Sequence, residues 1–222
     1  MKLYIIATPI GNLEDFAKRA VKTLESVDFI LCEDTRRTKL LLDYYKIATP
    51  VISYHQHSRL GKMDYILDLL SQNKELALVS DAGTPGIADP GNQLIDLAVK
   101  RFKDLAVIPV PGPCAAIAAL SISGFPTDKF IFYGFIPHKK GKEKILEEMI
   151  ESKITAVFYE SSYRIVKTLK RLKELELNKR MVVCRELTKK FETVYRGKIE
   201  EVLEKMEQGN LKGEFVVVVA PK

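Results

Sequence analysis

The sequence predicts a two-domain α/β protein, and three features of the chain support this prediction. Short apolar runs alternate with amphipathic helical patterns through the first half, as in the β-α units of a mostly parallel sheet. A stretch rich in breaker residues, 124–128, then interrupts the pattern, and a second set of strands and helices follows it. A chain of 222 residues is long enough for two compact domains, which we place at 1–123 and 124–222.

The first domain contains five predicted strands, each a short apolar run. They are Leu3–Ala7, Phe29–Cys32, Val51–Ser53, Leu76–Ser80 and Ala106–Val110. Apolar residues recur at helical spacing within 17–24 and 63–70, and further helices are expected over 40–44, 94–102 and 114–123. The alternation predicts a parallel sheet with helices between its strands.

The second domain is predicted to be smaller, with a mixed sheet. Its expected strands are Phe130–Ile136, Ile154–Tyr159, Met181–Glu186, Phe191–Tyr195 and Phe215–Ala220. Helical spacing of apolar residues appears in 165–172 and 199–206, and another helix is expected to begin near Glu143.

Composition places the chain among ordinary globular proteins, with 46% hydrophobic and 29% charged residues. Its three cysteines, in no C-x-x-C spacing, favour neither a disulfide framework nor a zinc site. No stretch has the length of a secretory h-region or of a membrane span. We therefore expect a cytoplasmic protein.

The net charge of +6 is distributed unevenly. Residues 1–111 carry 14 Lys and Arg against 14 Asp and Glu, which leaves 21 against 15 for the remainder. This asymmetry favours a polyanionic partner that contacts mainly the second half. Solvated lysines on helix surfaces are the alternative interpretation.

The loop 80–91 is the clearest candidate ligand site. It reads Ser-Asp-Ala-Gly-Thr-Pro-Gly-Ile-Ala-Asp-Pro-Gly and joins a predicted strand to a predicted helix. Parallel α/β sheets bind ligands at the carboxyl ends of their strands, and glycines allow a backbone to approach a ligand closely. A plain strand-to-helix turn is the alternative, but such turns typically need only about 2 to 6 residues.

Two nucleotide-binding motifs are missing from the chain. The segment 8–13, Thr-Pro-Ile-Gly-Asn-Leu, follows the first strand where a dinucleotide fold has G-x-G-x-x-G, and no G-x-x-x-x-G-K-[ST] occurs. Hydride transfer and nucleoside triphosphate hydrolysis are therefore disfavoured.

Further candidate residues follow other strands. Glu33 and Asp34 can supply a base and Arg36 and Arg37 phosphate contacts, although Thr35 can instead cap a helix that carries exposed arginines. His57, close to His55, is a candidate substrate-side histidine, and we expect no metal site because no third ligand accompanies the pair.

A basic segment follows the first strand of the second domain. It reads Pro-His-Lys-Lys-Gly-Lys over 137–142 and is not periodic. Lys139 and Lys140 are candidates for phosphate contact, and a solvated loop before the next helix is the alternative.

Eight segments together resemble the ribosomal RNA small-subunit methyltransferase I family, the RNA-acting branch of the tetrapyrrole methylase superfamily. They occur in the family's order and span nearly the whole chain: 7–13 (ATPIGNL), 33–36 (EDTR), 78–85 (LVSDAGTP), 111–116 (PGPCAA), 134–137 (GFIP), 158–161 (FYES), 185–189 (RELTK) and 212–215 (KGEF). Each is weak alone, but eight in order are specific.

The resemblance implies a tetrapyrrole-methylase-like (class III methyltransferase) fold, a homodimer, and S-adenosylmethionine bound in a cleft between the two domains. It implies 2′-O-methylation of a cytidine in the decoding region of small-subunit (16S) rRNA, in the assembled subunit. The residues that it assigns to the cofactor are Pro9, Ile10, Asp81, Ala82, Gly83, Thr84, Cys114, Ala115, Tyr159 and Gly213.

For the reaction, we expect the base to be Glu33, Asp34 or His57, and rRNA phosphates to contact Arg36, Arg37, Lys139 and Lys140. The chain departs from the family at Tyr163, where His is typical, and by ending at Lys222 where relatives continue, so RNA contacts are expected from the two domains. Two alternatives remain open: a small-molecule methyltransferase acting on a tetrapyrrole, and a non-catalytic RNA-binding module.

Overall fold

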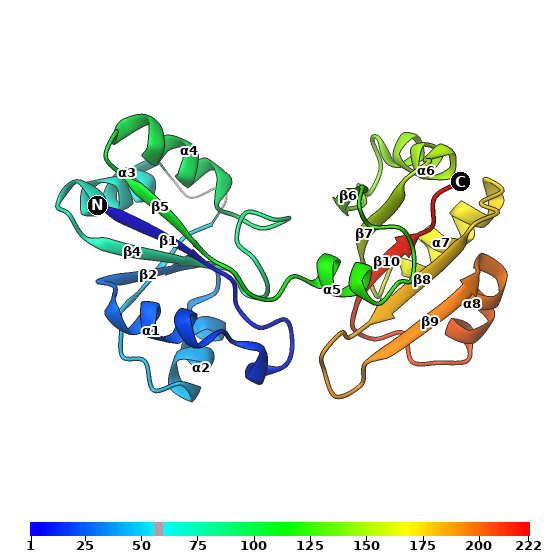
Figure 1. Ribbon diagram of the computed structural model, residues 1–222, viewed down its shortest axis with the longest axis horizontal. Coiled ribbons are helices and arrows are strands. Elements are labelled where there is room, and N and C mark those ends of the chain that lie inside the picture. The colour runs from blue at the N-terminus through cyan, green and yellow to red at the C-terminus, as the bar shows by residue number, and fades with distance from the viewer. Residues whose placement is uncertain (56–59) are drawn as a thin grey trace. The chain divides into compact units, whose positions relative to one another are not determined.

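The computed structural model describes residues 1–55 and 60–222, which divide into two compact units, Met1–Cys114 and Ala115–Lys222 (Figure 1). The boundary predicted after Ser123 groups residues 115–123 with the first domain. In the structure this segment contains helix α5 (Ala115–Ser121), which packs on strands β7 (Thr155–Ser161) and β10 (Glu214–Val219) of the second unit.

The first unit is built on a five-stranded parallel sheet with the strand order β3-β2-β4-β1-β5. The predicted parallel sheet is confirmed. Its strands are β1 (Lys2–Ile6), β2 (Phe29–Cys32), β3 (Val51–Ser53), β4 (Glu75–Val79) and β5 (Ala106–Val110), and its helices are the short η1 (Leu13–Asp15), α1 (Lys18–Ser26), α2 (Thr35–Tyr44), α3 (Leu60–Ser71) and α4 (Asn92–Arg101).

Helices cover both faces of this sheet, which explains why its strands are continuous apolar runs. Leu76 and Leu78 of β4 pack with α3 and α4, whereas Ala77 and Val79 point to the opposite face and pack with α1 and α2. Figure 1 shows the two helix pairs on opposite sides of the strands.

The second unit contains a mixed five-stranded sheet with the order β6-β7-β10-β8-β9. Strands β6 and β7 are parallel and the other neighbours are antiparallel. The remaining elements are β6 (Phe130–Phe135), α6 (Lys142–Glu151), α7 (Ile165–Glu174), β8 (Arg180–Arg185), β9 (Thr193–Lys198) and α8 (Ile199–Glu207). Strand β9 begins two residues after the predicted start, because Glu192 closes the turn by donating its backbone N–H to the Lys189 carbonyl.

The two faces of the second sheet are covered differently. Helices α6, α7 and α8 enclose the core around Phe158 and Phe215, while α5 crosses the opposite face. The Tyr159 hydroxyl accepts a hydrogen bond from the Ala116 N–H at 3.1 Å, and Arg196 donates to the Ile122 carbonyl at 2.6 Å. Both ends of this seven-residue helix are therefore fixed to the sheet. Among the helices in the described ranges, none has the length and apolar character that a membrane crossing requires.

Candidate functional site

The carboxyl ends of the first unit's parallel strands gather the motif segments of its sequence. The segment 8–13 follows β1, Glu33 and Asp34 follow β2, the loop 80–91 follows β4, and 111–114 follows β5. Because these strands are parallel, all four segments lie at one edge of the sheet, which is the edge where α/β proteins bind ligands.

Three of these segments are joined by hydrogen bonds. The Thr8 N–H donates to the Gly83 carbonyl at 2.8 Å and the Gly83 N–H donates to the Thr8 carbonyl at 3.1 Å. The Thr8 hydroxyl also donates to the Ser80 carbonyl at 3.0 Å, and the Thr84 hydroxyl donates to the Pro113 carbonyl at 3.1 Å. The contacts fix the loop 80–91 against the residues that follow β1 and β5.

Gly83 stands where these segments meet. Its φ of +83° lies in the left-handed region that favours glycine. A Cβ at this position would lie 3.5 Å from Ile10 Cγ2 and 3.7 Å from the Pro113 carbonyl oxygen. The sequence Ala82–Gly83–Thr84 therefore brings backbone rather than side chains close to Ile10, next to the half-buried Pro9.

Asp34 and Asp81 connect the ends of β2 and β4. The Asp34 N–H donates to Asp81 Oδ1 at 3.1 Å, and the Asp34 carboxylate caps α2 by accepting from the Arg36 N–H at 2.9 Å. The Arg36 guanidinium lies 2.8 Å from Asp34 Oδ2, and its hydrogen bonds hold the pKa of Asp34 well below its usual range. Arg37 Nη1 lies 3.5 Å from Asp81 Oδ2. The residue that caps α2 is thus Asp34 rather than Thr35. The exposed Arg36 and Arg37 form ion pairs with Asp34 and Asp81.

Asp89, which was not among the predicted site residues, lies in the same loop. The pKa of its carboxyl is raised to about 6, chiefly by burial and then by the negative charges of Glu33 and, to a smaller extent, Asp81. The Ser80 hydroxyl shares a hydrogen bond with this carboxyl, which opposes the shift. In the sequence, Asp89 is visible only as the second acid of the segment 80–91, and nothing there indicates that it is buried.

The predicted histidine His57 lies outside the described residues. His55 is exposed just after β3. Within residues 1–55 and 60–222, no group of three or more His, Cys, Asp or Glu is arranged to hold a metal ion.

The second unit likewise collects its motif segments at one edge of its sheet. Residues 134–137 end β6, 159–161 end β7, 185–189 end β8, and 212–213 precede β10. In the antiparallel register, Ser161 pairs with Glu214 and Arg185 with Phe215, so these segments are neighbours across the sheet. Lys139 and Lys140 are exposed in the turn that follows, before α6.

Tyr159 is the centre of a small aromatic group at this edge. Its ring lies edge-on to Phe132 and Phe135, with centroids 5.0 and 5.4 Å away. Its hydroxyl accepts a hydrogen bond from the Ala116 N–H, so Tyr159 lies next to Ala115, the first residue of α5. Two residues that the resemblance assigns to one cofactor are therefore adjacent within this unit, although 44 positions separate them in sequence.

Gly213 is held against the segment that follows β8. Its φ is +123°, and a Cβ here would come within 2.7 Å of Glu186 side-chain atoms. Glu186 Oε1 accepts from the Glu214 N–H at 3.0 Å and from Lys189 at 2.8 Å. Arg185, which is 6% exposed, donates to the Lys212 carbonyl at 2.7 Å. Hydrogen bonds thus join the motifs 185–189 and 212–215 to each other.

A buried ion pair supports the end of β7. The Glu160 side chain is fully buried and lies 2.7 Å from Arg164 Nη2. It also accepts from the Ser161 N–H at 2.9 Å and from the Thr168 hydroxyl at 2.8 Å. Arg164 in turn donates to the Ile136 carbonyl at 2.8 Å. The pair therefore links the ends of β6 and β7, directly beside Tyr159.

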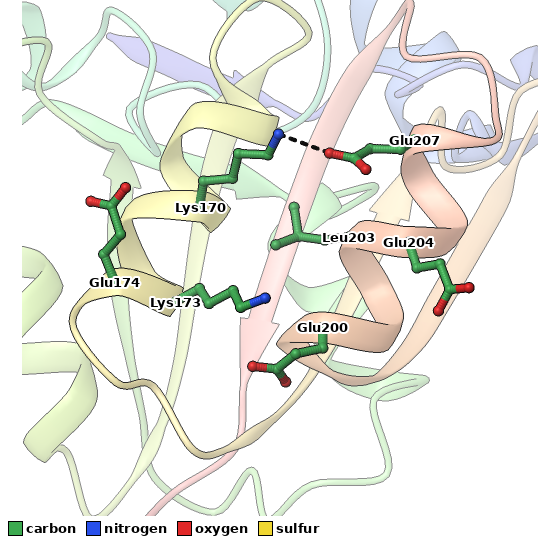
Figure 2. Close-up of a pocket in the computed structure, with 7 residues that line it drawn as sticks. All are labelled: Lys170, Lys173, Glu174, Glu200, Leu203, Glu204 and Glu207. Carbon is green, nitrogen blue, oxygen red and sulfur yellow. Dashed lines mark ion pairs between the residues drawn. The ribbon is translucent and has the colours of Figure 1, made fainter.

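A groove elsewhere in the second unit has a different character. It lies between α7 and α8 and is lined by Lys170, Lys173, Glu174, Glu200, Leu203, Glu204 and Glu207 (Figure 2). Lys170 and Glu207 form an ion pair across it at 2.8 Å. Its charged groups lie on solvated helix surfaces, and none of the predicted site residues lines it.

Comparison with known proteins relates the whole chain to one family. A family model described as Tetrapyrrole (Corrin/Porphyrin) Methylases matches residues 2–203. A protein of Halalkalibacterium halodurans, named ribosomal RNA small subunit methyltransferase I, is 45% identical over 98% of this chain and 75% of its own length. The protein of the same name from Bacillus subtilis is 45% identical over 98% of this chain and 74% of its own. The chain belongs to the ribosomal RNA small subunit methyltransferase I family of tetrapyrrole methylases.

Solved structures of two more distantly similar proteins share the fold of this chain. A diphthine synthase matches with a TM-score of 0.76 and 11% identity over 99% of this chain and 90% of its own. A cobalt precorrin-4 methyltransferase matches with a TM-score of 0.72 and 18% identity over 99% and 94%. The predicted fold class, a parallel sheet followed by a mixed one, is confirmed.

The residues present fit the S-adenosylmethionine on which this methyltransferase family depends. The cofactor offers apolar, hydrogen-bonding and cationic groups, and the first unit presents each complement. Ile10 and Ala82 are apolar, the positive-φ backbone at Gly83 leaves no side chain in the way, and the carboxylate of Asp81 is one-quarter exposed. Cys114, half-buried, ends the segment that follows β5.

Proposed function

We propose that this protein transfers the methyl group of S-adenosylmethionine to the ribose 2′-oxygen of a cytidine in the decoding region of small-subunit rRNA, acting as a homodimer on the assembled subunit. The observation that carries the proposal is the 45% identity, over 98% of the chain, to proteins named ribosomal RNA small subunit methyltransferase I. The basic excess of the second half is consistent with an RNA substrate.

We assign the cofactor to the residues that the resemblance names in each unit. Pro9, Ile10 and the segment Asp81–Thr84 hold it in the first unit, together with Cys114. Ala115, Tyr159 and Gly213 of the second unit complete the set. Support comes from the hydrogen bonds that fix Gly83 beside Ile10 and from the adjacency of Ala115 and Tyr159.

The bound cofactor supplies an electrophilic methyl group, so this chain's residues have two tasks. They align the ribose hydroxyl with the methyl carbon, for which correct orientation can lower a barrier by about 7–11 kcal/mol. They also remove one proton, for which a positioned base typically contributes about 10²- to 10⁴-fold. Alignment is the larger of the two contributions.

We assign to Glu33 the role of the base that accepts the proton of the ribose hydroxyl. Asp34 is the weaker candidate because its carboxylate caps α2 and pairs with Arg36, which holds its pKa low. His57 stays a third candidate. For the RNA phosphates, Lys139 and Lys140 are exposed, whereas Arg36 and Arg37 also face carboxylates of the site.

A substrate comparison tests the proposed reaction. Methyl transfer is measured with assembled small subunits, deproteinised rRNA and a tetrapyrrole, after calorimetry has established S-adenosylmethionine binding. We expect transfer to the subunit. Transfer to the tetrapyrrole alone contradicts the proposal, and an absence of cofactor binding supports a non-catalytic RNA-binding module instead.

A second test concerns the base. Glu33→Gln is expected to reduce turnover by about 10²-fold or more without changing cofactor affinity, and Asp34→Asn and His57→Gln serve as matched comparisons. Near-normal turnover in Glu33→Gln contradicts the assignment to Glu33, and near-normal turnover in all three contradicts the whole set.

A further inference from the structure

Two highly exposed aromatic side chains stand at the motif edge of the second sheet. Tyr163 is 96% exposed in the turn between β7 and α7, and Phe191 is 65% exposed in the turn between β8 and β9. Neither ring contributes to the core that helices α6, α7 and α8 cover. Both rings are therefore accessible to a ligand.

The backbones that present these rings are firmly held. In the β7–α7 turn, the Arg164 N–H donates to the Ser161 carbonyl at 3.0 Å, and the Arg164 side chain is fixed by Glu160. In the other turn, Arg185 Nη1 donates to the Phe191 carbonyl at 3.0 Å. Exposed rings on fixed turns lose little conformational entropy when a flat ligand stacks on them, because only two side-chain torsions are free.

Strand register places both turns at the same edge. Ser161 of β7 pairs with Glu214 of β10, and Arg185 of β8 pairs with Thr193 of β9. The strand order β7-β10-β8-β9 puts two inter-strand steps, or about 10 Å, between the ends of β7 and β8, where the two turns begin. The rings can therefore serve one extended ligand.

Several cationic side chains stand near the rings, among acids such as Glu192. The Lys190 ammonium lies 5.6 Å from the centroid of the Phe191 ring, and the exposed Lys139 and Lys140 follow β6 at this edge. Cations interleaved with exposed aromatic rings are typical of surfaces that bind single-stranded nucleic acid, where bases stack and phosphates meet cations. A duplex offers no free base faces to such rings.

We propose that Tyr163 and Phe191 are base-stacking residues that hold unstacked nucleotides of the RNA substrate at this edge of the second unit. The inference rests on the proposed action on rRNA and adds to it how the RNA is held.

A fluorescence experiment tests this directly, because the natural chain contains no tryptophan. In the Tyr163→Trp protein, we expect a short single-stranded RNA of the decoding region to quench the indole emission saturably, and the same strand annealed to its complement to leave it unchanged. Phe130→Trp is the matched control, since Phe130 begins β6 at the opposite edge of the same sheet. Equal quenching of both proteins, or no quenching of Tyr163→Trp, overturns the proposal.

Kinetics separate this inference from the proposed function. We expect Tyr163→Ala and Phe191→Ala each to raise the KM for small subunits by about fivefold or more, with kcat and cofactor affinity unchanged and Tyr163→Phe close to the natural protein. If the natural protein methylates subunits and both alanine variants keep its KM, the stacking role is wrong and the function stands. If the natural protein methylates no RNA, the proposed function is wrong. If the alanine variants sediment as a smaller species and RNA does not quench the Tyr163→Trp protein, the rings make a protein contact instead and the stacking role is wrong.

Discussion

Arg164→Ala is expected to destabilise the second unit by about 3–5 kcal/mol, the usual cost of removing one partner of a buried ion pair. The Glu160 carboxylate is fully buried, and without Arg164 it keeps only the Ser161 N–H and the Thr168 hydroxyl as donors. The variant also loses the hydrogen bond from Arg164 to the Ile136 carbonyl. Adding Glu160→Gln should recover part of the loss, because an amide needs no countercharge.

The measurement is urea unfolding, with amide hydrogen exchange in β7 and α7 to locate the effect. Arg171→Ala is the matched control, since Arg171 lies on the same helix and pairs with Glu143 at 2.8 Å and Glu174 at 2.9 Å, but in an exposed setting. Its loss should cost less than about 1 kcal/mol. Equal costs for the two alanine variants refute the argument that burial makes the Glu160 pair important.

Two further predictions concern other parts of the site. Gly213→Ala should weaken both S-adenosylmethionine binding and stability, because the added Cβ would collide with Glu186. Gly124→Ala is the control, since its φ is +73° but the space around it is open, and calorimetry should show no change in its cofactor affinity. Equal losses of cofactor affinity in the two variants contradict this prediction. Asp89→Asn should raise the free energy of unfolding at pH 7 by about 1–2 kcal/mol after discounting for solvent screening. The pKa of Asp89 in the folded protein, about 6, exceeds its unfolded value. The loss of stability caused by the Asp89 carboxylate is therefore absent below about pH 4 and grows as the pH rises through 6. A stability difference between the natural protein and Asp89→Asn that does not depend on pH contradicts this prediction.

Much of the fold was predictable because burial leaves a direct pattern in the sequence. Strand β4 is apolar at Leu76, Ala77, Leu78 and Val79 because helices cover both faces of the first sheet, and that run marked it as a buried strand. The motif segments of the first unit were predictable as loops because each follows such a run. Their convergence at the edge of a sheet follows from strand direction, which the alternation of helices and strands indicated for the first unit.

Other features depend on contacts that no local pattern encodes. Helix α5 was grouped with the first domain because breakers follow it, but hydrogen bonds to Tyr159 and Arg196 attach it to the second sheet. The spacing of Glu160 and Arg164 is visible in the sequence, yet the full burial of Glu160 depends on the packing of β7 against α7. The burial of Asp89 was hidden for the same reason.

The proposed function is tested most directly by a map of ribose methylation in small-subunit rRNA from cells with and without this protein. We expect one 2′-O-methylated cytidine of the decoding region to lose its modification without the protein and to regain it when the natural chain is supplied. An unchanged methylation map would contradict the proposed function.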